Sequence, residues 1–244
     1  MAVVGRIAYG CDGNLHDSDD ILASALALAL LSKNGLAGQL AHYHYNGHFW
    51  GDSSLEVVPN QEARMTVSSL ATPNFWPGFN MANFFDARTQ TATVISHLTG
   101  LINASTASDP LWLIAAGPME IIGRAVNASS PSARQHVYLI SHSAGFNDFH
   151  AQEAIDTQEV GWEQLQGWTY PEVVALGVNG VHIANQNNVL NAPHSEYFWL
   201  RDSPDVALRW VWARSQDPAP AEFSSYGPGS GYIWQPVVFD DNDS

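Results

Sequence analysis

The chain has 244 residues and a formal charge of -15, with 24 acidic against 9 basic side chains. This length fits one large α/β domain with a sizeable core, and the shortage of Lys and Arg argues against binding nucleic acid through its phosphates. The single cysteine, Cys11, excludes an intramolecular disulfide.

The amino terminus shows no signal-peptide pattern, and the apolar run over residues 21–31 is too short to span a bilayer. We therefore expect no membrane partner. For the chain as given this favours a cytoplasmic location, or export if a leader was trimmed. The sequence leaves the oligomeric state open, a homo-oligomer included.

The first elements alternate between strands and helices. Residues 3–9 form an apolar run that predicts a strand, and residues 19–33 predict a helix that is apolar all round and ends at Asn34-Gly35. Residues 39–45 predict the next strand. The region 53–83 is rich in Asn, Pro and aromatic residues, and its prolines break any regular pattern. Residues 72–78 therefore predict a loop, either beside a site or held in place by its own aromatic side chains.

The second half continues this alternation. We predict helices over residues 89–103, 119–127 and 204–213, with Gly117-Pro118 starting the second of them. Strands are predicted over residues 111–116 and 135–142. Residues 173–178 and 181–184 predict two further short strands, or a strand and a turn. Residues 215–244 are rich in Pro, Gly and Ser and predict coil. The interpretation is one domain over residues 1–214 with a coil extension over 215–244.

Such alternation predicts a mostly parallel central sheet with helices on both faces. In such sheets, ligands bind at the carboxyl ends of the strands. Polar residues follow apolar runs at five places, and we expect them to meet at one edge of the sheet: Asp12, Asn46, His142, Asn185 and Asp202.

The loop before the first helix is acidic, with Asp12, Asp17, Asp19 and Asp20 inside nine residues. Four carboxylates this close repel one another unless a cation lies among them or some are protonated. Helix capping accounts for one or two of these acids and not for four. The loop therefore predicts a site for a hard divalent cation, Ca²⁺ or Mg²⁺, or for a polar ligand.

Three motifs resemble the nucleoside hydrolase superfamily, including its inosine-uridine preferring members. Gly10-Cys11-Asp12, Gly13 and Asp19-Asp20 are similar to the family's Asp-x-Asp-Pro-Gly-x-Asp-Asp signature. Residues 113–122 resemble its strand leading into a Thr-Gly-Pro motif, and Asp202 stands where the family has a late Asp before a helix. Order and rough spacing agree over residues 5–213, which implies a divergent member with a nucleoside hydrolase-like fold.

The resemblance implies a calcium-bound water that attacks the anomeric carbon of a ribosyl group. Asp12 would be the general base, and the candidate proton donors for the leaving group are His194, His142 and His182. Asp17 or His16 would substitute for a ligand missing at Gly10. The implied metal ligands are Asp12, Asp17, Asp20, the carbonyl of Ala116, and Asp202. The expected substrate-binding residues are Asp19, Asn46, His142 and Asn147.

The chain departs from the family pattern in four respects, which include a loop before Asp19-Asp20 that is longer by three residues and Ala116 in place of a Thr. Gly10 replaces the family's first Asp, and Arg201 replaces the His that precedes the late Asp. These departures resemble superfamily members without an assigned nucleobase substrate, some of them from polysaccharide-using bacteria.

The leading hypothesis is a metal-dependent glycosyl hydrolase that acts on an N-ribosidic or related bond of a small glycoside or nucleoside. The alternative is a carbohydrate-binding protein that keeps the fold and has lost catalysis. An Mg²⁺-dependent phosphohydrolase would need a basic phosphate-binding cluster, which the sequence lacks. His42, His44 and His48 could instead hold a transition metal, while Ser143 lacks the Gly-x-Ser-x-Gly elbow of serine hydrolases.

Overall fold

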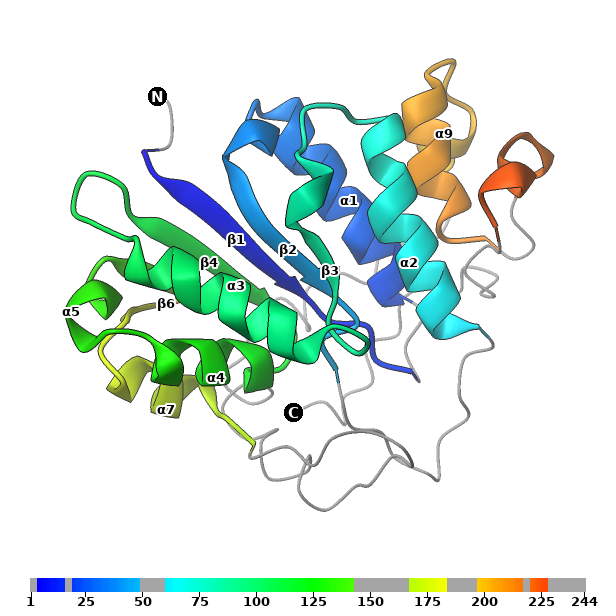
Figure 1. Cartoon of the computed structure of the whole chain (residues 1–244). Coiled ribbons are helices and arrows are strands. Elements are labelled where there is room, and N and C mark those ends of the chain that lie inside the picture. Colours follow the sequence, from blue (N-terminus) through cyan, green and yellow to red (C-terminus); the bar gives the residue numbers. More distant parts are fainter. Residues whose placement is uncertain are drawn as a thin grey trace.

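The structure, a computed structural model, describes residues 4–15, 19–48, 60–142, 167–183, 197–216 and 220–227. At its centre lie six parallel strands in the order β3-β2-β1-β4-β5-β6 (Figure 1). They are β1 (Arg6–Cys11), β2 (Leu40–Tyr45), β3 (Phe84–Asp86), β4 (Leu111–Ala116), β5 (Val137–Ser141) and β6 (Asn179–His182). The predicted α/β class with a mostly parallel sheet is confirmed.

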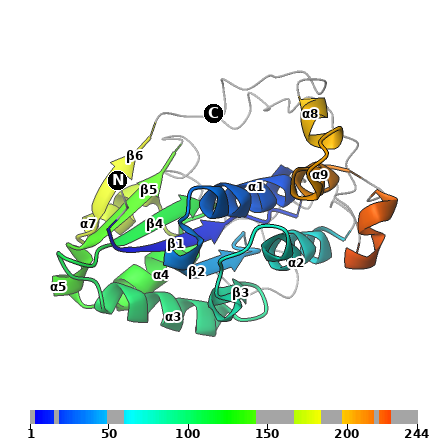
Figure 2. The ribbon, with the colours of Figure 1, turned by 90° about the horizontal axis from the view of Figure 1, so that it is seen from above.

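Helices lie on both faces of this sheet. Figure 2 shows α1 and α9 on one face and α3 and α4 on the other. The described α-helices are α1 (Asp19–Lys33), α2 (Gln61–Ala71), α3 (Thr91–Asn103), α4 (Glu120–Ala128), α5 (Pro131–Arg134), α7 (Tyr170–Ala175), α8 (Phe198–Arg201) and α9 (Val206–Ala213). Short 3-10 turns are η1 (Ala37–Gln39), η2 (Thr72–Asn74), η3 (Met81–Asn83) and η5 (Ala221–Tyr226). None of the described helices combines the length and apolar character needed to cross a membrane.

The sheet separates two apolar cores, because successive side chains of a strand point to opposite faces. Ala8 of β1 packs with Leu113 of β4 and with α3, α4 and α7. Its neighbour Ile7 packs on the other face with Tyr43 of β2 and with α1 and α2. The buried thiol of Cys11 belongs to this second core.

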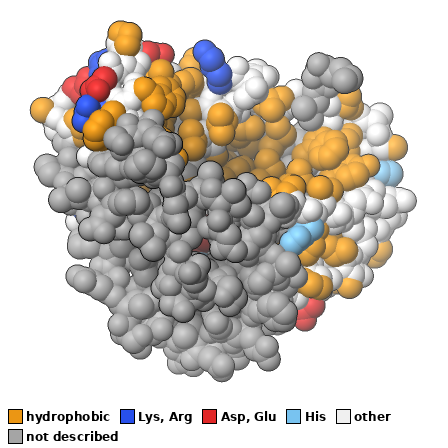
Figure 3. All heavy atoms as spheres, turned by 180° about the vertical axis from the view of Figure 1, so that it is seen from behind, with side chains coloured by type: hydrophobic (Ala, Val, Ile, Leu, Met, Phe, Trp, Pro, Cys, Tyr) orange, Lys and Arg blue, Asp and Glu red, His pale blue; other side chains and the backbone are white. Residues whose placement is uncertain are grey.

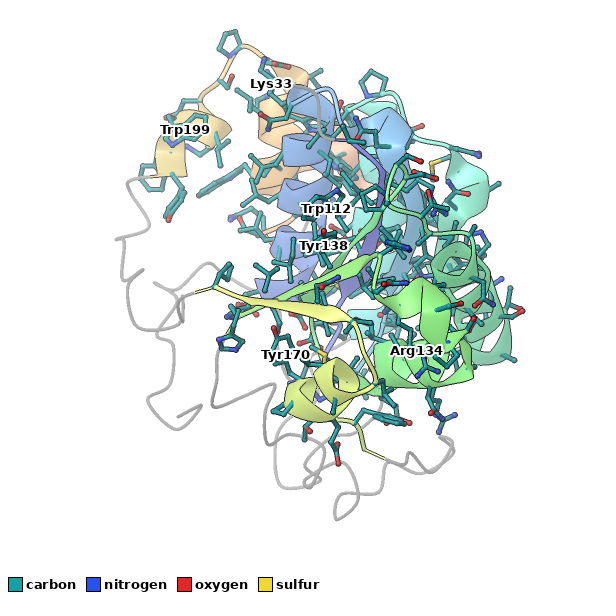
Figure 4. The ribbon with its side chains drawn as sticks, turned by 90° about the vertical axis from the view of Figure 1, so that its left-hand side faces the viewer. Lys33, Trp112, Arg134, Tyr138, Tyr170 and Trp199 are labelled. Atoms are coloured by element: carbon teal, nitrogen blue, oxygen red, sulfur yellow. The ribbon has the colours of Figure 1, made fainter. Side chains whose placement is uncertain are left out.

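On the α1 face, β5 and β6 carry apolar side chains that the described residues leave partly exposed. Tyr138 stacks on Trp112 of β4 with ring centroids 4.5 Å apart (Figure 4), and Val181 is 37% exposed. Leu26 and Leu30 of α1 are 43% and 55% exposed. Figure 3 shows apolar side chains gathered on the side of the molecule turned away in Figure 1.

One prediction about secondary structure is wrong, and one helix was not predicted. Residues 173–178 were predicted as a strand from Val173-Val174, but a capping box of Thr169 and Glu172, with Pro171 in the first turn, starts helix α7. No regular element was predicted in the Pro-broken region 53–83, but it contains α2, whereas the predicted loop over residues 72–78 holds only the 3-10 turn η2. The buried face of α2 includes Arg64 and two serines as well as Met65, so the apolar period is weak.

The remaining predicted elements differ mainly at their ends. The helix over 19–33 has the predicted bounds, and α3, α4, α9 and strands β4 and β5 lie within two residues of prediction. The sequence did not predict the three-residue strand β3. The domain boundary at residue 214 stays a prediction, and beyond it Phe223 of η5 packs against Trp210 of α9 with ring centroids 5.4 Å apart.

Candidate functional site

The carboxyl ends of the parallel strands bring several polar side chains to one edge of the sheet. Asp12 follows β1 and His48 follows β2 after a short turn, and His48 Nδ1 lies 2.8 Å from Asp12 Oδ1. The ring of His48 is fully buried, whereas the Asp12 side chain is 15% exposed. Since an ionised carboxylate can only accept, Nδ1–H of His48 donates to Asp12 and fixes its orientation.

Asp20 holds the loop that carries Asp12. Its Oδ2 accepts hydrogen bonds from the backbone N–H of Gly13 at 3.0 Å and of Asn14 at 2.8 Å. Asp20 also lies in the first turn of α1, next to Asp19, where the helix dipole favours negative charge. In the described structure this carboxylate thus has a structural task of its own.

Asn46 closes the next loop in a strained backbone conformation. Its φ is 55°, its side chain is fully buried, and its Nδ2 donates to Asp86 Oδ1 at 3.2 Å. A Cβ on Gly13 would lie 2.7 Å from Asn46 Cα, so the loops after β1 and β2 touch backbone to backbone. Within the described part of the chain, Asn46 Oδ1 accepts no hydrogen bond.

Arg88 ties these loops together. Its Nη2 donates to the carbonyl of Gly13 at 2.9 Å and to that of His48 at 2.8 Å, and its Nη1 lies 2.5 Å from Glu62 Oε1 of α2. Asp86 and Arg88 end and follow β3. The rule that polar residues follow strands would have found both, but β3 is too short to show a period.

The neighbouring strands place two more predicted residues at this edge. Ala116 ends β4 in register with Cys11, directly before Asp12. His142 follows β5, where burial and then His182 lower its pKa while Asp12 opposes the shift. Asp12, Asn46 and His142, three of the five residues expected at this edge, therefore lie along it together with Ala116.

Steric contact with a neighbouring strand explains why position 10 is a glycine in this fold. A Cβ at Gly10 would lie 2.8 Å from both Cε1 and Nε2 of His44 on the adjacent strand. The imidazole of His44 therefore occupies the space above Gly10 in which another residue's side chain would begin.

In the part of the chain that the structure describes, Asp202 forms no group of three potential metal ligands with Asp12 and Asp20. It follows α8, is exposed, and forms a two-pronged ion pair with Arg201 at 2.7 and 2.8 Å, and this hydrogen bonding lowers its pKa. Figure 4 shows Trp199 of the same helix near the end of α1 marked by Lys33. Among the described residues, no three His, Cys, Asp or Glu side chains form a group that could hold a metal ion.

Five predicted polar residues lie outside the described ranges. They are His16, Asp17, Asn147, Asn185 and His194. Their roles stay predictions, as does the calcium site to which Asp17 would contribute.

Comparison of the sequence with known proteins finds a related protein and no family model. No model of a known protein family matches the chain. The uncharacterized protein P22 of Formosa agariphila is 34% identical over 210 residues, which are 85% of this chain and 72% of P22. The chain belongs to the P22 family.

Among solved structures, the chain is similar to a nucleoside hydrolase-related hypothetical protein from Saccharophagus degradans that is associated with carbohydrate metabolism. The TM-score is 0.44 at 13% identity, over 94% of this chain and 53% of that chain. The P22-family chain thus spans about half the length of that structure. This likeness does not establish membership of the nucleoside hydrolase superfamily.

Proposed function

We propose that the protein is a hydrolase that cleaves an N-ribosidic or related glycosidic bond of a small glycoside or nucleoside, with Asp12 as general base. The observation that carries this proposal is the Asp12–His48 pair at the carboxyl edge of a parallel sheet. Because His48 binds one oxygen of the carboxylate, the orientation of the other is fixed. That oxygen can take the proton of a water that attacks the anomeric carbon.

The surrounding residues have supporting tasks in this proposal. Asn46 and His142 would contact sugar hydroxyls, since both lie along the same edge. Arg88 holds the loops of Gly13 and His48 in place through their carbonyls. Asp19, Asn147 and the proton donor His194 are proposed for substrate contact and leaving-group protonation from the resemblance alone.

The described residues fit the implied Ca²⁺ in part. Asp12 and the carbonyl of Ala116 end adjacent strands, and hard cations prefer such oxygen ligands. Asp20 already binds two backbone amides through one oxygen, and Asp202 is paired with Arg201. Ca²⁺ would lower the pKa of a bound water. The proposed ligands of Ca²⁺ are Asp12, Asp17 and the carbonyl of Ala116, and Mg²⁺ is the other candidate for this site.

The metal is tested by calorimetric titration of EDTA-treated protein with Ca²⁺ and, separately, Mg²⁺. Binding should be lost in Asp12→Asn and kept in Asp202→Asn. Loss of binding in Asp202→Asn would show that Asp202 is a metal ligand, as the resemblance implies. If the wild type binds neither ion, the metal is removed from the proposal.

Activity is tested with p-nitrophenyl riboside and inosine. Asp12→Asn should lose about 10²–10⁴-fold in rate, the usual contribution of a positioned base. Asp109→Asn is the matched control, because Asp109 pairs with Arg6 at 2.9 Å before β4, at the opposite edge of the sheet. An Asp12→Asn variant with full activity would remove Asp12 from the mechanism. A wild type that binds sugars without hydrolysing any would favour the carbohydrate-binding alternative.

A further inference from the structure

Three histidines form a continuous hydrogen-bonded row beside the site. His42 and His44 lie on the same face of β2, and His97 lies on α3, which packs against that face. His97 Nδ1 is 2.9 Å from His42 Nδ1, and His42 Nε2 is 3.0 Å from His44 Nδ1. Phe85 flanks the outer pair, with ring centroids 5.3 Å from His42 and 4.8 Å from His97.

The distances identify these contacts as hydrogen bonds and not as a metal site. Two imidazole nitrogens on one tetrahedral zinc ion, each about 2.0–2.1 Å from it, lie more than 3 Å apart and both point to the ion. Here each close pair of nitrogens needs one N–H donor and one bare acceptor. The hypothesis of a transition-metal site at His42, His44 and His48 is not supported, since His48 bonds to Asp12 instead.

The rings are neutral near neutral pH. His42 is 0% and His44 2% exposed. Burial, and then the neighbouring His44 and His97, lower the pKa of His42, while burial lowers the pKa of His44 to about 4. Burial also lowers the pKa of the half-buried His97. A neutral imidazole carries one N–H and one acceptor nitrogen, so the direction of one hydrogen bond fixes the direction of the other.

The row joins the outer side of α3 to the edge of the site. His97 is the outer end, and exposed residues such as Ser96 and Gly100 lie on either side of it. At the inner end, the Nε2 of His44 lies against two residues without side chains, Gly10 and Gly47. The backbone N–H of Gly47 donates to the carbonyl of Asp12 at 2.6 Å. The inner end thus adjoins the loop that carries Asp12.

We propose that His97, His42 and His44 are a proton relay between solvent and the carboxyl edge of the sheet. In the inward step, water or buffer gives a proton to His97 Nε2, and the Nδ1 proton of His97 moves to His42 Nδ1. The Nε2 proton of His42 moves to His44 Nδ1, and the Nε2 proton of His44 leaves to a water molecule at the carboxyl edge of the sheet. One proton enters and one leaves, and no ring keeps a charge. Transfer in the reverse direction restores the first arrangement.

The relay does not rest on the proposed hydrolysis, because it can be measured without substrate. In protein labelled with ¹⁵N-histidine, NMR follows the exchange of the ring N–H protons of His42 and His44 with water. A relay makes this exchange depend on the outer ring. His97→Gln keeps a side chain that can hydrogen bond to His42 but cannot pass a proton on. We expect it to slow the exchange by about 10²-fold, the lower end of what a positioned proton-transfer group contributes.

His136→Gln is the matched control, since His136 is a partly buried histidine outside the row. It should leave the exchange of His42 and His44 unchanged. In His97→Ala, added imidazole should restore the exchange by acting in place of the missing ring. In the wild type, the exchange should rise with buffer concentration, which also tests the relay if the variants fail to fold.

Two results would overturn the relay. One is ring-proton exchange in His97→Gln that equals the wild type. The other is wild-type exchange that is independent of buffer and follows the backbone amides of β2, since the protons would then exchange only when the strand opens. Either result would make the row a packing feature.

Discussion

Replacing Gly10 by alanine tests the packing of β1 against β2 with a single methyl group. The added Cβ would lie 2.8 Å from two atoms of the His44 ring and 3.5 Å from Ile122 Cδ1. The ring cannot easily retreat, because it is buried and its Nδ1 is hydrogen-bonded to His42. Overpacking a core costs about 1–3 kcal/mol. Losing the His42–His44 hydrogen bond adds about 1 kcal/mol.

We therefore expect Gly10→Ala to lower the free energy of unfolding by about 2–4 kcal/mol. Urea denaturation measures this change. Gly100→Ala is the control, since Gly100 lies in α3 with nothing within 4 Å of an added Cβ. That variant should gain about 0.5–1 kcal/mol. The cost of Gly10→Ala should largely vanish in a His44→Ala background. A Gly10→Ala protein as stable as the wild type would refute the reasoning.

Three more predictions concern the buried polar groups. Because burial lowers the pKa of His44 to about 4 from 6.5, the unfolded chain binds a proton before the folded one. Stability should therefore fall by on the order of 3 kcal/mol as the pH drops from 6.5 to 4. His44→Gln should flatten this fall in urea titrations, and parallel curves would contradict it. Tyr43→Phe removes the 2.6 Å hydrogen bond to the buried Ser24 and should cost about 1–2 kcal/mol by the same measurement; an unchanged midpoint would contradict this. Arg88→Lys cannot bind Gly13, His48 and Glu62 together. It should lower glycoside hydrolysis about 10-fold with little change in melting temperature, whereas full activity would show that the clamp does not position the site.

The fold could be predicted from the sequence where an element consists of a continuous apolar run. The strand at 111–116 and the helix at 19–33 bury continuous apolar runs, and their composition alone predicts them. α2 was missed because its buried face combines hydrogen bonds with few apolar contacts. Ser69 bonds to Ser24 at 3.0 Å, and Ser68 donates to the carbonyl of Ile21. Polar side chains buried in this way look like loop residues in a sequence.

The candidate site was accessible only in part, for a similar reason. The ends of strands predict that Asp12, Asn46 and His142 share an edge, because parallel strands end together. The contacts of His48 and Arg88 depend on loop conformations that no period encodes. Asp202 was placed in the site by resemblance alone, and in the structure its carboxylate pairs with the neighbouring Arg201.

The strand order has a consequence for how the chain reaches this structure. β1 lies in the interior of the sheet between β2 and β4, and these two neighbouring strands are synthesised at very different times. β2 follows after one helix, but the other edge of β1 waits for β4, since Arg6 pairs with Leu111 about a hundred residues later. Until then a nascent half-sheet carries an unpaired apolar edge, which is a template for association between chains. Slow refolding and loss to aggregates at high concentration are the expected signature of this order.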